Sequence, residues 1–186
     1  MSATAVSPPA EPKPRAGENG NRRIRILKVV VNAGVGQSGD PLTKATKVLE
    51  MITRQKPVAT HSRTTNRDFG IRAGQIIGAK VTLRGDHAKE FLDRAFDARD
   101  RQFDADSIDK WGNFSLGIAD YTDFAGMKYD PEIGIHGMDI SVEVGRGGYR
   151  VRERRIGARA IPIRLRSSRD ETRQFLANNF HLTFVE

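Results

Sequence analysis

The chain has no cysteine among its 186 residues. This absence excludes disulfide bonds and thiolate metal sites, and it suits a reducing compartment. Long hydrophobic runs are missing as well: no segment approaches the roughly 20 apolar residues that a membrane helix needs, and the N-terminus has no hydrophobic signal core. We therefore expect a soluble, cytoplasmic protein with no membrane partner, of a length that suits a single domain.

Acidic residues are few relative to basic ones. The sequence has 31 Lys and Arg against 23 Asp and Glu, a net charge of +8. Residues 146–169 alone hold nine arginines and a single acid, Glu153. So concentrated a positive field is costly unless an anion neutralises it. The charge therefore favours a nucleic-acid partner over a merely solvated face.

Apolar periodicity predicts the order of the elements after a tail. Residues 1–22 are rich in Pro, Ala, Gly and charge without an apolar face, which predicts a disordered tail. Residues 23–186 are expected to form one α+β domain, which includes an arginine-rich insert at about 146–167. The expected elements are strands at 24–33, 57–62, 76–84, 113–118 and 138–144, and helices at about 41–54, 87–102 and 168–179.

These elements predict an α+β fold, in which helices pack on one face of a mainly antiparallel sheet with basic loop extensions. A long loop without a helix joins strands 57–62 and 76–84, so their simplest relation is an antiparallel hairpin. Ser168 and Glu171 match a capping box at the start of the last helix. Asp40 and Asp86 are expected to cap the first two helices.

A glycine motif follows the first strand, in which Gly34–Gly39 spells G-x-G-x-x-G. This pattern between a strand and a helix is typical of dinucleotide binding, but it also requires an acid after the second strand. That strand instead ends in His61-Ser62-Arg63, although Arg63 could accept a 2′-phosphate. A second strand-helix-strand crossover is missing too. The motif is therefore interpreted as a turn, and a nucleotide-dependent enzyme is kept as the alternative.

Other catalytic or metal-binding patterns are weak. The four histidines are scattered, without the spacing of metal ligands or of a nucleophile and its base. The irregular segment around Asp120, Asp123, Asp130 and Asp139 could hold a divalent ion, but isolated loop aspartates usually form turns. We expect a protein without catalysis, metal or cofactor.

Four segments, taken in order, resemble the ribosomal protein L-five family, whose members hold 5S rRNA in the large subunit. They are KVVVNAGVGQSGDPLTKATKVLE, QKPVATHSRTTNRDFGIRAGQIIGAKVTLRG, GNFSLGI and YDPEIGIHGMDISVEVGR. The insert GRGGYRVRERRIGARAIPIRLRSS is similar to the archaeal and eukaryotic branch, and the Pro-rich tail favours an archaeal member. The resemblance implies a structural RNA-binding domain on the ribosome. Its expected partners are 5S rRNA, large-subunit rRNA, P-site tRNA and neighbouring ribosomal proteins of the central protuberance and the small-subunit head.

The resemblance also implies three polar contacts to 5S rRNA, made by Asn32, Gln55 and Thr82. Carboxamide and hydroxyl groups can bond base edges, ribose or phosphate. Taken alone, the same residues could satisfy the turn, cap a helix end and face solvent from a strand. Arg54 stands where many family members have glycine, which affects how the helix ends. Basic neighbours expected to join these contacts are Arg54, Lys56, Lys80 and Arg84.

Two further basic segments complete the expected interface. The loop 61–75 corresponds to the family's loop toward the elbow of P-site tRNA, with a flexible surface loop as the alternative. Its expected contacts are Arg63, Thr64, Arg67, Phe69 and Arg72. In the insert, the expected contacts are Arg146, Arg150, Arg152, Arg154, Arg155 and Arg159. A free-standing RNA-binding regulator with this fold remains an alternative to a ribosomal protein.

Overall fold

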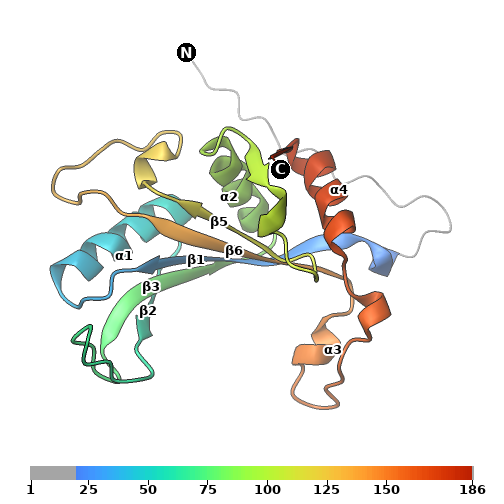
Figure 1. The fold of residues 1–186 in the computed structure, drawn as a ribbon, viewed down its shortest axis with the longest axis horizontal. Coiled ribbons are helices and arrows are strands. Elements are labelled where there is room, and N and C mark those ends of the chain that lie inside the picture. Colours follow the sequence, from blue (N-terminus) through green and yellow to red (C-terminus); the bar gives the residue numbers. More distant parts are fainter. Residues whose placement is uncertain (1–19, 186) are drawn as a thin grey trace.

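The computed structural model describes residues 20–185, whose centre is a five-stranded antiparallel sheet (Figure 1). The strand order across the sheet is β2-β3-β1-β6-β5. Every neighbouring pair runs antiparallel, including the predicted β2–β3 hairpin. The strands are β1 (Ile24–Gly34), β2 (Val58–His61), β3 (Ile76–Leu83), β5 (Phe114–Ile118) and β6 (Met138–Arg146).

One face of this sheet is covered by helices and the other is not. Helices α1 (Asp40–Thr53), α2 (Asp86–Asp97) and α4 (Arg169–Phe180) lie on one side in Figure 1, and their buried residues share one core with β1, β3, β5 and β6. Alternate residues of β6 are buried, from Met138 to Val144, and those between them are exposed or half-buried. The α+β prediction with helices on one face is confirmed.

The alternation of inward- and outward-facing side chains along the central strand β1 shifts by one residue near its start. Val29 and Val31 are fully buried, and each is paired on both sides. A β-bulge at Leu27 shifts the register between β1 and β6, because Ile26 pairs with Val144 while Lys28 pairs with Glu143. Ile26 before the bulge and Val29 after it therefore both face the core, and an uninterrupted alternation would not allow this.

The first two helices begin one residue earlier than expected. Gly39 and Gly85 occupy the N-cap positions, with no side-chain cap. Asp40 and Asp86 lie inside the first turns, so their expected capping role is wrong. Their carboxylates still complement the positive end of the helix dipole. The capping box of α4 is confirmed, since the Ser168 hydroxyl accepts from the Glu171 amide and the Glu171 carboxylate from the Ser168 amide.

Helix α2 ends at Asp97, five residues before its predicted end. Asp100 and Arg101 adopt left-handed backbone conformations, with φ of 53° and 56°. The chain reverses there and enters β4 (Gln102–Asp104), which pairs in parallel with β7 (Thr183–Val185). The apolar stripe on which the helix was predicted ends at Phe96, within α2, and the buried Phe103 packs against the ring of Phe96 from strand β4.

An aromatic cluster ties the C-terminal elements to the sheet. Rings of Phe96, Phe103, Phe114, Phe180 and Phe184 pack with centroids 5.2–6.2 Å apart. Most of these pairs meet edge to face, the arrangement that aromatic quadrupoles favour. The cluster joins α2, β4, β5 and the end of α4 into one core.

The predicted disordered tail falls largely on residues 1–19, which lie outside the described residues. Residues 20–22 form a short 3-10 turn before β1, so the tail prediction is wrong for these three. No helix within residues 20–185 combines the length and the apolar composition that a membrane crossing needs.

Helix α1 ends in a residue that glycine suits better. Arg54 has φ 54° and ψ 25°, and its amide bonds the Glu50 carbonyl at 2.8 Å. A side chain in this left-handed region is strained. We expect Arg54→Gly to raise the free energy of unfolding by about 0.5–1 kcal/mol relative to Arg54→Ala in urea denaturation. Arg54→Ala is the matched control because it also removes the charge near Arg94, and equal stabilities of the two variants would contradict backbone strain.

Candidate nucleic-acid interface

The uncovered side of the sheet carries a cluster of polar and basic side chains. We call this side the open face. In the register of β1 with its neighbours, Asn32 lies between Lys80 of β3 and Asp139 of β6, and Thr82 pairs with Val30. Directly paired residues of an antiparallel sheet point to the same side with Cβ atoms about 5 Å apart. Three predicted contacts, Asn32, Lys80 and Thr82, are therefore brought together.

The remaining predicted contacts of this group lie outside the strands of the sheet, at the end of α1 and just after β3. Gln55 is half-buried between α1 and β2, and its amide lies 3.4 Å from the Thr53 hydroxyl. Lys56 and Arg84 are exposed, the latter just after β3. Arg54 is exposed and lies near Arg94 of α2. Burial of Arg94 lowers the pKa of its guanidinium, and the nearby positive charge of Arg54 lowers it further.

Acidic residues divide the open face into two halves. Asp139 and Glu143 both come from β6, whereas β2, β3 and β1 contribute only neutral and basic residues. Glu143 bonds Lys28 at 2.7 Å and Arg152 at 2.6 Å. Burial opposes ionisation of Glu143, but these two bonds outweigh it and hold the pKa of its carboxyl below the ordinary value. The half of the open face suited to an anion is therefore the side of β2, β3 and β1.

The predicted loop 61–75 is a folded extension of the β2–β3 hairpin. The amide of Ser62 bonds the Gln75 carbonyl at 2.8 Å, and Asn66 and Ile71 exchange two backbone bonds. Ser38 fixes its base, donating to the Ile76 carbonyl and accepting from the Gln75 side chain. The ring of Phe69 at the tip is 76% exposed. Four further predicted contacts on this hairpin are also exposed: Arg63, Thr64, Arg67 and Arg72.

The glycine turn is not arranged to cradle a phosphate. The amides of Val35 and Gly36 both donate to the Ile77 carbonyl, at 3.1 and 2.8 Å, so a ligand cannot use them. The preceding strand β1 has antiparallel neighbours on both sides, whereas a dinucleotide fold requires parallel ones. The motif is a turn that joins β1 to α1, and the antiparallel sheet excludes the dinucleotide-binding fold.

The arginine-rich insert leaves the sheet after β6 and returns to it before α4. It contains the short helix α3 (Arg150–Glu153) and projects on the side opposite α2 and α4 (Figure 1). At its end, the Ser167 hydroxyl donates to the Trp111 carbonyl at 2.7 Å. The guanidinium of Arg166 stacks 4.4 Å above the ring of Trp111. The C-terminal end of the insert is therefore held against the domain.

Part of the insert's charge is neutralised by acids from elsewhere in the chain. Arg146, only 17% exposed, bonds Glu171 of α4 at 2.6 Å. Arg152 bonds Glu143 and Glu153, and the Nε of Arg154 donates to the Gly157 carbonyl. Counting acids within the segment missed Glu143 and Glu171. Among the predicted contacts, the side chains of Arg150, Arg155 and Arg159 have no such partner within residues 20–185.

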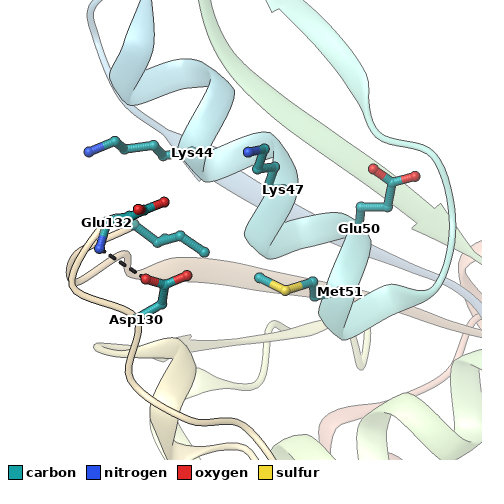
Figure 2. Close-up of a pocket in the computed structure, with 7 residues that line it drawn as sticks. Lys44, Lys47, Glu50, Met51, Asp130 and Glu132 are labelled. Carbon is teal, nitrogen blue, oxygen red and sulfur yellow. Dashed lines mark hydrogen bonds between the residues drawn. The ribbon is translucent and has the colours of Figure 1, made fainter.

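A groove of mixed charge lies between α1 and the segment before β6 (Figure 2). Lys44, Lys47 and Met51 of α1 face Asp130 and Glu132 across it. The Asp130 carboxylate accepts from the Glu132 amide at 2.9 Å, which is a turn contact. Within residues 20–185 there is no group of three or more His, Cys, Asp or Glu side chains that could hold a metal. The groove differs from the open face because acids and bases are interspersed.

Family comparisons account for most of the chain. Residues 19–72 match the family Ribosomal protein L5, and residues 76–182 match the C-terminus of the same ribosomal family. The chain belongs to the ribosomal protein L5 family. Large ribosomal subunit protein uL5 of Picrophilus torridus is 52% identical over 90% of this chain and 96% of its own. The same protein of Thermoplasma volcanium is 52% identical over 90% and 99%, and that of Aeropyrum pernix is 45% identical over the whole of both.

Membership of the L5 family confirms the resemblance seen in the motifs. The relatives named above are archaeal proteins. Members of this family are structural ribosomal proteins and not enzymes, which agrees with the arrangement of the glycine turn. The predicted protein without catalysis is confirmed.

Sequence reasoning missed two basic residues on the open face, Lys28 and Arg25. Lys28 could have been found, because it shares the alternation of Val30 and Asn32 along β1. Arg25 could not have been found from the sequence. Simple alternation from Asn32 would place its side chain on the helix-covered face, and the bulge at Leu27 moves it to the open face. A single extra residue in a strand moves every preceding side chain to the other face.

The Glu143 network gives a test of stability. Glu143→Gln breaks both ion pairs, so we expect the free energy of unfolding at pH 7 to fall by about 1–2 kcal/mol. Because the pKa of Glu143 is lowered, its contribution is complete above the ordinary glutamate pKa of about 4.3 and is lost as the pH falls through the lower folded value. Urea titrations across this range should show the two proteins converging at acid pH.

The control for this test is Glu153→Gln. Glu153 is 53% exposed and bonds the same Arg152, so its loss should change stability by less than about 0.5 kcal/mol. If both variants lost the same stability at pH 7, the network would not depend on Glu143.

Proposed function

We propose that the protein is a structural constituent of the large ribosomal subunit that binds 5S rRNA with its open face and anchors it in the central protuberance. The observation that carries this proposal is the grouping of Asn32, Lys80 and Thr82 on exposed strands that no helix covers. The relatives bear the name large ribosomal subunit protein. The motif resemblance supplies 5S rRNA as the ligand.

The two kinds of side chain have different tasks in this proposal. Asn32, Gln55 and Thr82 bond base edges or 2′-hydroxyls and so set the register of the RNA. Charged neighbours supply affinity through phosphate contacts that carry no sequence information. These neighbours are Arg54, Lys56, Lys80 and Arg84.

The β2–β3 hairpin is proposed to contact P-site tRNA. An exposed aromatic ring such as Phe69 can stack on a base or pack against a ribose, and arginines beside it can reach phosphates. The ladder within the hairpin supports this role, since it holds the tip away from the core at little further entropic cost. The contacts are assigned to Arg63, Thr64, Arg67, Phe69 and Arg72.

The insert is proposed to make additional rRNA contacts, to 5S rRNA where it borders the open face and to large-subunit rRNA beyond it. Arg150, Arg155 and Arg159 serve as direct contacts, because their guanidinium groups are exposed. Arg152 and Arg154 already bond other residues of the chain, and they contact RNA through the guanidinium N–H groups that these bonds do not use. Arg146 is assigned a positioning role beside these contacts, since Glu171 already holds its half-buried side chain.

Protein partners are expected on a different surface. Tyr129 and Ile135, which are 57% and 69% accessible, flank in the sequence the residues Asp130, Glu132 and Ile133 that line the groove. Aromatic and aliphatic groups bordered by charges of both signs are typical of protein interfaces. We assign this surface to neighbouring ribosomal proteins, including those of the small-subunit head.

Asn32→Ala tests the 5S rRNA assignment. We expect binding to 5S rRNA to weaken about tenfold, as the loss of a good base contact does, with binding to an unrelated RNA unchanged. Filter binding or fluorescence anisotropy measures both. Ser115→Ala is the matched control, a neutral exposed residue of the same face on the distant strand β5. An equal loss on both RNAs would contradict a role for Asn32 in recognition.

Phe69→Ala tests the hairpin assignment. In reconstituted ribosomes we expect P-site tRNA to bind about tenfold more weakly, the worth of one stacked ring. The isolated variant should bind 5S rRNA as the wild type does. Wild-type affinity for tRNA would contradict a contact at the tip.

Co-sedimentation separates a ribosomal protein from a free-standing RNA-binding regulator. The tagged full chain, expressed in cells, should sediment with large subunits at moderate salt. A chain found only in the soluble fraction would favour the regulator.

A further inference from the structure

A concave basic pocket lies where the arginine-rich insert meets the end of the open face. Three distant parts of the sequence line it: Arg25 on β1, Arg84 after β3, and Arg150, Arg154 and Arg155 in the insert. Its volume is about 640 Å³, a size typical of sites for small ligands. A phosphate with its ribose fits such a space.

A β-bulge and two glycines of the backbone form the pocket. The bulge at Leu27 leaves Arg25 on the outer side of β1, opposite Gly145. A Cβ at Gly145 would lie 2.7 Å from the side chains of both Leu27 and Tyr149, so only glycine lets these chains approach so closely. The chain then turns at Gly148, with φ 94°, and leads into α3.

The charge of the pocket is not balanced from within. Two carboxylates line it, but Glu143 is bound by Lys28 and Arg152, and Glu153 by Arg152. The five lining arginines named above have no carboxylate partner within residues 20–185, and their charges repel one another in a concave site unless an anion enters. Within residues 20–185, no hydrogen bond or ion pair engages the side chains of Arg25, Arg84, Arg150 and Arg155.

We infer that this pocket binds a backbone phosphate of the RNA strand that crosses the open face. The inference rests on the proposed function, which supplies the RNA. Arg84 follows Thr82 by two residues on the outward side, about 7 Å along the strand, so the RNA contacted by Thr82 leads directly to the pocket. Guanidinium groups suit phosphate because they donate two parallel hydrogen bonds.

The double variant Arg25→Ala/Arg150→Ala of the full chain tests the pocket. With 5S rRNA as the probe, we expect binding about tenfold weaker at physiological salt, and a slope of log affinity against log salt shallower by about 2. Hydroxyl-radical footprinting should show one stretch of the RNA backbone losing protection, distinct from the stretch affected by Asn32→Ala. Both arginines are exposed and no side-chain bond within residues 20–185 engages them, so the melting temperature should be retained.

A matched control is Arg99→Ala/Arg164→Ala, which removes the same charge from exposed positions outside the pocket. If both double variants changed affinity, slope and footprint equally, the pocket would not be a distinct site and the inference would be overturned. The proposed function would survive that result if Asn32→Ala still reduced 5S preference. A wild type without any preference for 5S rRNA would overturn both.

Free inorganic phosphate is the alternative ligand for this pocket, because it carries the same anionic group as the RNA backbone. Calorimetric titration of the wild type should show at most millimolar binding of the free ion. Micromolar binding that Arg25→Ala/Arg150→Ala abolishes, with RNA binding unchanged, would assign the pocket to a free anion and overturn the RNA assignment.

Discussion

Burial of alternate apolar residues of β1, β3 and β6 against α1, α2 and α4 holds this domain together. Val29, Val31, Leu83 and Ile140 are all but inaccessible to solvent, and each such side chain contributes about 1.5–3 kcal/mol. Because strand side chains alternate, the residues between them must point away from the helices. On that side they stay hydrated, so Lys, Asn and Thr at these strand positions lower the stability of the fold very little. The same packing that stabilises the fold creates the flat polar surface.

Intramolecular ion pairs decide how much positive charge this surface offers. Glu143 holds Lys28 and Arg152, and Glu171 holds Arg146 while also capping α4. These carboxylates position the insert against the domain. Among the arginines that they do not reach are those of the pocket, the middle of the insert and the β2–β3 hairpin. The net charge of +8 is thus concentrated at particular sites.

The glycine turn illustrates how context decides the meaning of a motif. Its letters match a phosphate-binding loop, yet two of its amides complete hydrogen bonds to β3. The residue before the glycines that we propose as an RNA contact is Asn32, which the strand register places between Lys80 and Asp139. Topology, and not the spacing of glycines, separates the two cases.

The sequence by itself determined the five strands of the main sheet, the helix of the capping box, the one-sided sheet and the family, because these depend on local alternation and short motifs. It did not determine the end of α2, strand β4, or the side of β1 on which Arg25 lies. Those depend on a left-handed reversal, a pairing across about 80 residues and a single bulge. Which arginines remain free was likewise decided only in three dimensions, since their carboxylate partners come from other elements. Long-range pairing leaves no periodic trace in the sequence, and tertiary structure alone brings such groups together.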